Sequence, residues 1–386
     1  MEPIYLDYAA STPVDPRVLA VMLPYFHESF GNPSSVHRYG QQAEAAVETA
    51  RETIAATLNC RPEEIIFTSC GSESDNLALR GVAMAMREKT GANWILTSRA
   101  EHPAVSKTAI QLEKQHGFQV EWLPVDKFGI VRPETLEKAI CNNTAIVSVM
   151  YSNNEIGAIN PIRELAAVCR AHNVPFHTDA VQAAAYLPVN VQALSVDLMS
   201  LGAHKYYGPK GIGALYIRKG TPIASILTGG GQEFGMRAGT SNVPLIVGFA
   251  EALRLAAEER AARTASLQPL RDHLIGAVLE SIPYVRLTGP IENRMPNHAS
   301  FVFKDVDGNL LLNLLDAAGF ACSSGSACKT GNPEPSDVIN ALGLSRDWAL
   351  GSLRITLGSD TTPAHIDAFL QVLPGLVQKS RSLTRG

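Results

Sequence analysis

The sequence predicts an α/β protein built on a largely parallel sheet with helices on both faces. Between about residues 64 and 217, short apolar runs alternate with helical stretches, which is the pattern of successive βαβ units. The runs are apolar throughout, as is typical of strands that are buried on both faces. With 386 residues, and roughly 150 residues per domain, the chain is expected to form two domains, or three at most.

Six apolar runs in this region are expected to be strands: Ile65–Phe67, Trp94–Leu96, Ala145–Val149, Val174–Phe176, Asp197–Met199 and Gly213–Ile217. Helical periodicity between them predicts helices at Asp75–Lys89, Pro103–His116, Ile162–His172 and Val181–Ala184. A long helix, rich in Ala, Leu, Glu and Arg, is expected to bridge the two domains from about Ile246 to Glu280. A smaller α/β unit follows, with strands at His298–Phe303 and Leu353–Thr356 and helices at Leu310–Ala318 and Pro363–Val377.

The composition is that of an ordinary soluble enzyme. The chain has 33 basic and 37 acidic residues, so its net charge is −4 and it has no basic excess to recruit nucleic acid or a membrane surface. The first residues lack the features of a signal peptide, and no window of about 18 apolar residues predicts a membrane span, so we expect a cytoplasmic protein. Six scattered cysteines are expected to be reduced: Cys60, Cys70, Cys141, Cys169, Cys322 and Cys328.

Polar residues follow five of the predicted strands. Ligands of open α/β sheets bind beyond the carboxyl ends of the strands, so these residues are expected to share one site. They are Ser69–Glu73, Glu101–Pro103, Asn153–Glu155, Asp179 with Gln182, and His204–Lys205.

Lys205 is expected at a strand end rather than on a solvated helix face. Pyridoxal phosphate (PLP) requires a lysine for its Schiff base, an acid beside its ring nitrogen and a phosphate cradle. Asp179 ends an apolar strand and provides the acid, and Gly71 with Ser72 at a helix start provides the cradle. The sequence has neither the glycine fingerprint of dinucleotide enzymes nor a P-loop motif, so those phosphate binders are not favoured.

Each of these features also has a simpler interpretation. Gly71 and Ser72 are compatible with an ordinary helix N-cap, His102 with a capping or core histidine, and Asn153–Asn154 with a turn. The coincidence of all of them at consecutive strand ends favours a single site.

The segment 321–336 places Cys328 in a small, polar, glycine-bearing loop. Reactive thiols lie in partly exposed sites near positive charges, which favour the thiolate. Lys329 directly follows Cys328 and provides such a charge. An ordinary turn before a helix that begins near Pro335 is the alternative. Cys322 is six residues away and no pair of histidines lies nearby, so a zinc site is not expected.

Taken in order, these motifs resemble the cysteine desulfurases of the NifS/IscS type, in the class V aminotransferase branch of the fold-type I PLP enzymes. The resemblance implies a large PLP-binding domain, 15–260, with a mostly parallel seven-stranded sheet. A smaller α/β domain, 1–14 and 261–386, would carry the cysteine loop. The matching segments are Tyr5–Ala10, Gly31–Ser35, Thr68–Asn76, Glu101–His102, Asn153–Gly157, Asp179–Gln182, His204–Gly213, Gly229–Thr240, Ser323–Ser336 and Arg354.

The resemblance also implies how the cofactor is bound. Lys205 would form the Schiff base, Asp179 would pair with the ring nitrogen, and Gln182 would hydrogen-bond the ring oxygen. His102 would stack on the ring and move protons. The phosphate would be held by Gly71, Ser72 and His204, with Thr240 from the other subunit of a homodimer. Asn154, Gly202 and Ala203 would also contact the cofactor.

The implied reaction converts L-cysteine to L-alanine. Asn154 and Arg354 would clamp the substrate carboxylate, and Cys328 would be the nucleophile that carries away the sulfur as a persulfide. An acceptor protein in iron–sulfur cluster assembly or tRNA thiolation would then receive the sulfur. No resident metal is implied, although Cys328 can contact a nascent iron–sulfur cluster during transfer.

Gly202 departs from the family pattern, because many relatives have a serine there that contacts the phosphate. One hydrogen bond to the cofactor is therefore expected to be missing. A selenocysteine lyase or another enzyme of the class V aminotransferase type on the same fold is the alternative function, as is a catalytically silent sulfur carrier. The Cys328 loop favours desulfuration, because transamination needs no protein thiol.

Overall fold

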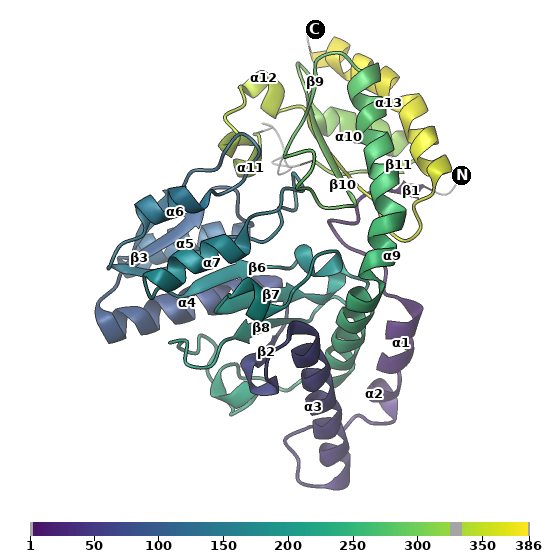
Figure 1. The fold of residues 1–386 in the computed structure, drawn as a ribbon. Helices are drawn as coiled ribbons and strands as arrows, with labels where there is room; N and C mark the ends of the chain where they lie inside the picture. Colours follow the sequence, from purple (N-terminus) through teal and green to yellow (C-terminus); the bar gives the residue numbers. More distant parts are fainter. Residues whose placement is uncertain (1–2, 325–333, 385–386) are drawn as a thin grey trace.

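A computed structural model describes residues 3–324 and 334–384 (Figure 1). Its main sheet has seven strands in the order β2-β8-β7-β6-β5-β3-β4. Strand β8 is antiparallel to both of its neighbours, and the remaining pairs are parallel. The predicted α/β class is confirmed. The strands are β2 (Ile65–Thr68), β3 (Trp94–Ser98), β4 (Gln119–Leu123), β5 (Thr144–Ser148), β6 (Phe176–Asp179), β7 (Leu198–Gly202) and β8 (Gly213–Ile217).

Successive residues of these strands enter two different cores, one on each face of the sheet. Ile95 and Ile146 pack with helices α4 (Gly71–Thr90) and α5 (Pro103–His116). Their neighbours Leu96 and Val147 belong to the larger core on the other face. That face is covered by α3 (Arg38–Leu58), α6 (Pro133–Ala139), α7 (Ile162–Ala171), α8 (Val191–Leu194) and the first half of α9 (Val243–Ser281).

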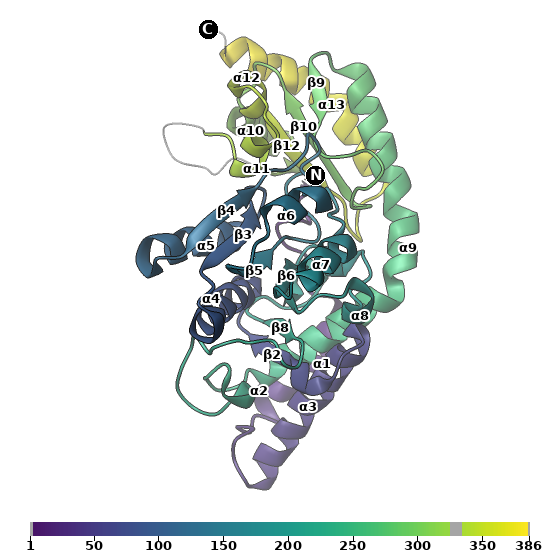
Figure 2. The same cartoon turned by 60° about the vertical axis from the view of Figure 1, so that its left-hand side comes forward.

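Helix α9 runs the length of the molecule and joins the two parts of the chain, as predicted (Figure 2). Its first half packs against α3, α1 (Pro16–Met22) and α2 (Pro24–His27). Its second half packs against the C-terminal part. This part contains β9 (Val285–Leu287), β10 (His298–Phe303), α10 (Gly308–Ala317), β11 (Phe320–Ala321), α11 (Asp337–Ala341), α12 (Arg346–Ala349), β12 (Ser352–Thr356) and α13 (Pro363–Thr384).

The N-terminus belongs spatially with the C-terminal part. Strand β1 (Ile4–Tyr5) pairs in parallel with β11, and the three-stranded antiparallel sheet β12-β10-β9 lies beside it. This arrangement is consistent with the domain boundaries expected near residues 15 and 260, which stay a prediction. In the described residues, no helix is both long and apolar enough to cross a membrane.

Several elements differ from the sequence prediction. Strand β4 and helix α6 were not predicted, because both are short and β4 is only partly buried. Strand β6 extends through the polar residues His177 and Thr178, which are fully buried. The helix predicted at Val181–Ala184 is a single 3-10 turn at Ala183–Ala185.

Candidate active site

A cavity of about 250 Å³ lies at the carboxyl ends of β2, β3, β5, β6 and β7. These five ends meet at one edge because β2 and β7 are both antiparallel to β8 and therefore parallel to each other. The cavity brings together nine of the predicted site residues: Gly71, Ser72, His102, Asn154, Asp179, Gln182, His204, Lys205 and Arg354. It is also lined by Cys70, which lies in the predicted stretch Ser69–Glu73, and by five residues that were not predicted: Ala9, Ala10, Asp75, Met150 and Val181.

The remaining predicted residues lie elsewhere. Gly202 and Ala203 are buried behind the cavity at the end of β7. Thr240 is exposed and lines a separate cavity of about 210 Å³, next to Ser69 and Arg237. Cys328 lies outside the described residues.

Lys205 is partly buried in a 3-10 turn that directly follows β7. Its Nζ donates hydrogen bonds to the backbone oxygens of Ala9, at 2.7 Å, and Ala10, at 2.8 Å. Burial and the nearby charge of Arg354 lower the pKa of Lys205 to about 8, partly offset by two carboxylates. A substantial fraction of this amine is therefore neutral near physiological pH, as a base or nucleophile requires.

Asp179 is the last residue of β6 and its side chain is buried. Its Oδ1 accepts a hydrogen bond from the backbone N–H of Val181 at 2.9 Å. Burial raises the pKa of Asp179, and its interactions with His102 and Lys205 oppose that rise only in part. A positive charge beside Asp179 favours its ionised form, and Lys205 is the side chain of this cavity that can carry one.

Asp75 is a second carboxyl group in the same cavity, and only 1% of it is exposed. Its Oδ1 has no hydrogen-bond partner among the described residues. Burial and the charge of Asp179 raise the pKa of Asp75, and no cation opposes the shift. Two neighbouring buried carboxyl groups do not readily both ionise, and the charged form is more strongly opposed at Asp75, which lacks a cationic neighbour, than at Asp179.

His102 caps helix α5, because its Nδ1 accepts a hydrogen bond from the N–H of Ala104 at 3.1 Å. The capping interpretation is therefore correct, and it is compatible with a place in the site, since the ring also lines the cavity. Burial lowers the pKa of His102. The ring is thus neutral, with its proton on Nε2.

The start of α4 has the features of an anion site. Cys70 occupies the N-cap position and its side chain makes no capping hydrogen bond, so the first N–H groups of the 20-residue helix lack a side-chain cap. A Cβ atom at Gly71 would come within 2.6 Å of Val181 Cγ2, so only glycine keeps this turn open. His204 lies across the cavity, and burial lowers its pKa to about 4.

Arg354, on β12, is almost fully buried. Its Nη2 donates to Asp7 Oδ1 at 2.7 Å and its Nη1 to the backbone oxygen of Asn154 at 3.1 Å. Its Nε has no hydrogen-bond partner among the described residues. A guanidinium that lines a cavity carries a fixed positive charge there and is suited to bind an anionic group of a ligand.

The N-terminal segment Asp7–Thr12 was missed as part of the site. Besides holding Lys205, the backbone oxygen of Ala9 accepts a hydrogen bond from Gln182 Nε2 at 2.7 Å. Thr12 donates through both its backbone N–H and its hydroxyl to the backbone oxygen of His204. These contacts use backbone carbonyl groups, which every residue has, so side-chain identity gives little signal of them.

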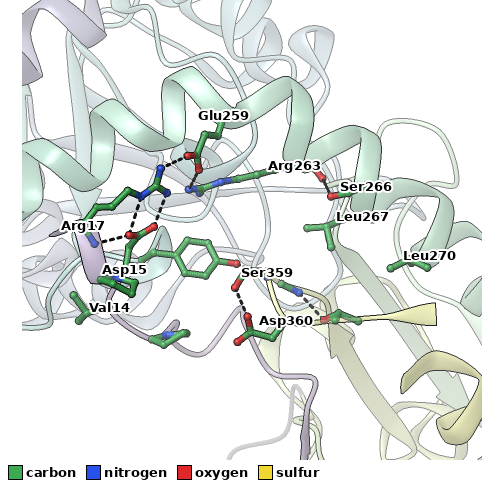
Figure 3. Close-up of a pocket in the computed structure, with 15 residues that line it drawn as sticks. Val14, Asp15, Arg17, Glu259, Arg263, Ser266, Leu267, Leu270, Ser359 and Asp360 are labelled. Atoms are coloured by element: carbon green, nitrogen blue, oxygen red, sulfur yellow. Dashed lines mark hydrogen bonds and ion pairs between the residues drawn. The ribbon is translucent and has the colours of Figure 1, made fainter. Parts of the chain in front are cut away.

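A larger cavity, of about 600 Å³, lies elsewhere, between α1, α9 and the loop Gly358–Thr361 (Figure 3). The charged side chains there pair with one another. Arg17 bonds Asp15 at 2.7 Å and Glu259 at 2.5 Å, and Glu259 also accepts from Arg263 at 2.9 Å. This cavity is not at the carboxyl edge of the sheet and is lined by no lysine. Among the residues placed by the structure, no cluster of His, Cys, Asp or Glu is arranged to hold a metal ion.

The fold and the smaller cavity together define an α/β enzyme with a desolvated lysine at the carboxyl edge of its main sheet. The family model described as Aminotransferase class-V matches residues 4–369, and the chain belongs to this family.

Two similar members of this family are named cysteine desulfurase IscS. The chain is 46% identical over 381 residues to the cysteine desulfurase IscS of Dictyoglomus turgidum, covering 99% of this chain and 96% of the relative. It is 45% identical to the IscS of Methanosarcina thermophila, covering 99% and 93%. These matches confirm the resemblance to the NifS/IscS desulfurases.

Solved structures agree with this placement. A NifS-like protein has a TM-score of 0.90 at 38% identity, covering 98% of this chain and 100% of the other. The protein SspA, in a complex with cysteine, has a TM-score of 0.79 at 36% identity, covering 92% and 98%. The fold class of the NifS-like PLP enzymes is therefore confirmed.

Proposed function

We propose that this protein is a PLP-dependent cysteine desulfurase, which converts L-cysteine to L-alanine and passes the sulfur through Cys328 to an acceptor. The proposal rests on three residues that line one cavity. A desolvated lysine, a buried aspartate and a buried arginine, whose Nε has no hydrogen-bond partner among the described residues, line it together. The relatives named as cysteine desulfurases support the same function.

The residues present fit the cofactor. The uncapped start of α4, with Gly71, Ser72 and His204, would hold the phosphate, and Asp179 would pair with the ring nitrogen. Gln182, oriented by Ala9, would face the ring oxygen. When bound, PLP acts as an electron sink for the bonds at the substrate Cα. Lys205 would remove the Cα proton, and the neutral His102 would exchange protons through Nε2.

The surroundings of Arg354 support a place for the Cys328 segment beside the substrate. Ser323, just before that segment, exchanges two backbone hydrogen bonds with Arg354, at 2.7 and 3.3 Å. Ser336, just after it, donates a hydrogen bond to Glu155 at 2.6 Å, next to Asn154. One flank is therefore bound to Arg354 and the other to the neighbour of Asn154 in the sequence, and these two residues would clamp the substrate carboxylate.

The sulfur step balances as a thiolate substitution. The Cys328 thiolate would form a bond to the substrate sulfur while the bond from that sulfur to the substrate Cβ breaks. The electron pair of the broken bond stays with the carbon fragment, which takes up protons to become L-alanine. The persulfide would then pass its outer sulfur to an acceptor of the iron–sulfur assembly or tRNA thiolation pathways, in the cytoplasm.

A homodimer is part of this proposal. Thr240 does not reach the cavity of its own chain, which is consistent with a contact to the phosphate site of a partner. Large apolar side chains are exposed on two segments that would provide the interface. They are Leu19, Val21, Leu23, Phe26, Phe30, Val36 and Tyr39 in the first, and Ile226, Leu227 and Phe234 in the second.

The test is to incubate the purified, PLP-loaded protein with L-cysteine and a reductant and to quantify L-alanine. We expect alanine from the parent and from Cys141→Ser, which replaces an exposed thiol elsewhere, but none from Cys328→Ser. Equal alanine from both variants would remove Cys328 from the reaction. No alanine from the parent despite bound cofactor would overturn the desulfurase assignment.

A further inference from the structure

The cation that would bind the substrate carboxylate already has a carboxylate partner. Arg354 Nη2 and Asp7 Oδ1 are 2.7 Å apart, and the two side chains are only 8% and 17% exposed. Asp7 comes from the N-terminal segment, while Arg354 lies on β12, so the pair joins distant parts of the chain. Ion pairs in such poorly solvated positions interact more strongly than pairs on the surface.

Asp7 does not use all the donors of Arg354. Nη1 is bound to the backbone oxygen of Asn154, and Nε has no hydrogen-bond partner among the described residues. Arg354 lines the cavity, whereas Asp7 does not. Because Arg354 lines the cavity, a carboxylate that enters it would meet the guanidinium while Asp7, which is not part of the lining, stays bound to Nη2.

We propose that Asp7 is a resident counter-ion of Arg354, which weakens the binding of the α-carboxylate of substrate and product. This inference rests on the proposed function, because it takes Arg354 as the carboxylate clamp. A ligand carboxylate on Arg354 would lie close to the Asp7 carboxylate, and two anions repel each other in a poorly solvated site. Asp7 thus weakens the net electrostatic attraction between Arg354 and the carboxylate of the ligand.

Such a counter-ion has a physical use in catalysis. Binding energy that substrate and transition state share does not raise kcat, and a buried arginine without a counter-charge would also retain the product. Other charges near Arg354 do not replace Asp7. Lys205 is a second cation facing the same cavity. Burial raises the pKa of Glu155 to about 7, so that carboxyl group is only partly ionised at neutral pH.

The test measures how tightly simple carboxylates bind to the PLP-loaded protein and to its Asp7→Asn variant. Asparagine keeps an oxygen that accepts the Nη2 hydrogen bond but removes the charge. Propionate is titrated by calorimetry at constant pH and ionic strength, with ethylamine as the probe that lacks a carboxylate. Asp15→Asn is the matched control, because Asp15 pairs with Arg17 on the same N-terminal segment, away from the site.

We expect Asp7→Asn to bind propionate about tenfold more tightly than the parent, since one nearby negative charge is removed. Ethylamine binding and the Asp15→Asn variant should not show this gain. Unchanged or weaker propionate binding in Asp7→Asn would overturn the proposal. If that variant does not fold, Asp7→Ser removes the same charge with a smaller side chain and is judged by the same outcomes.

The desulfurase function and the counter-ion role of Asp7 can be overturned independently. Tighter propionate binding in Asp7→Asn without alanine formation by the parent would overturn desulfuration and leave the counter-ion in place. Alanine formation by the parent, without tighter binding in the variant, would overturn only the counter-ion.

Discussion

The Nζ of Lys205 lies 2.7 Å from the backbone oxygen of Ala9, which is 196 residues earlier in the chain. This contact is one of several by which the segment Asp7–Thr12 reaches the site from the N-terminus. The backbone N–H of Ala9 is in turn bound by Thr356 Oγ1 at 2.8 Å. The position of the Lys205 amine therefore depends on a hydroxyl group on β12, in the C-terminal part of the chain.

Thr356→Val should disturb the site, although Thr356 does not itself line the cavity. Valine has nearly the shape of threonine but leaves the buried N–H of Ala9 without its acceptor, which costs about 1–3 kcal/mol. We expect the free energy of unfolding to fall by that amount, measured by denaturant titration. We also expect kcat for alanine formation to fall roughly tenfold, since misplaced catalytic groups lose rate steeply.

Ser352→Ala is the matched control for this variant. Ser352 is buried on the same strand, and its hydroxyl has no hydrogen-bond partner among the described residues. Its removal should change stability by less than about 1 kcal/mol and leave kcat unchanged. Equal losses in the two variants would mean that the bond from Ala9 to Thr356 has no special part in the site.

The two buried carboxyl groups of the cavity should respond differently to loss of charge. Asp179→Asn removes the anion that would face the ring nitrogen, and we expect kcat to fall at least about a hundredfold, as for other electrostatic groups in active sites. Burial and the charge of Asp179 raise the pKa of Asp75. We therefore expect Asp75→Asn to replace a neutral group and to leave kcat within about threefold of the parent. Infrared spectra should show a protonated-carboxyl band that Asp75→Asn removes. Loss of kcat in Asp75→Asn without loss of that band would show that Asp75 is ionised.

His177 should make the protein less stable as the pH falls. It is fully buried between Ser148 and Ser200, at 2.8 and 2.9 Å, and burial lowers its pKa to about 3. An unfolded histidine takes up its proton near pH 6.5, whereas the folded one does not until about pH 3. Its contribution to stability is therefore complete above about pH 6.5 and is lost progressively between these two values.

The measurement is the free energy of unfolding as a function of pH, for the parent and for His177→Gln. Between about pH 6 and pH 4, the parent should lose up to about 1.4 kcal/mol per pH unit more than the variant. The difference between the two slopes removes the contribution of groups common to both proteins. Parallel slopes would show that His177 takes up its proton in the folded state.

Gly202 offers a gain-of-function test. A Cβ atom there would lie 3.4 Å from both the backbone nitrogen of Gly71 and Val181 Cγ1, which is a tolerable distance. Gly202→Ser should therefore fit. It should add one hydrogen bond near the phosphate cradle, tightening PLP binding about fivefold for about 1 kcal/mol.

Gly202→Ala is the control for this test, because it adds the Cβ atom without the hydroxyl and should leave PLP affinity unchanged. Both variants are compared by titrating PLP into the cofactor-free protein and following absorbance. Equal affinities of the serine and alanine variants would show that the hydroxyl does not reach the phosphate.

The sequence was sufficient to predict the class of fold and most of the cavity. Alternating apolar runs and helical stretches predict a parallel sheet, and a parallel sheet brings its strand ends to one edge. Asp179 and Lys205 could therefore be placed in one site from their positions after strands alone. The two-domain boundaries, the dimer and the assignment of Cys328, which lies outside the described residues, stay predictions.

Only the tertiary structure decided how these groups are held and charged. The backbone oxygens that bind Lys205 have no side-chain signature, and the ionisation of Asp75 and Asp179 depends on burial and on which cations lie nearby. The pairing of Asp7 with Arg354 arises from the proximity of two segments 347 residues apart. Local patterns in a sequence determine periodicity and strand ends, whereas desolvation and long-range contacts exist only once the chain is folded.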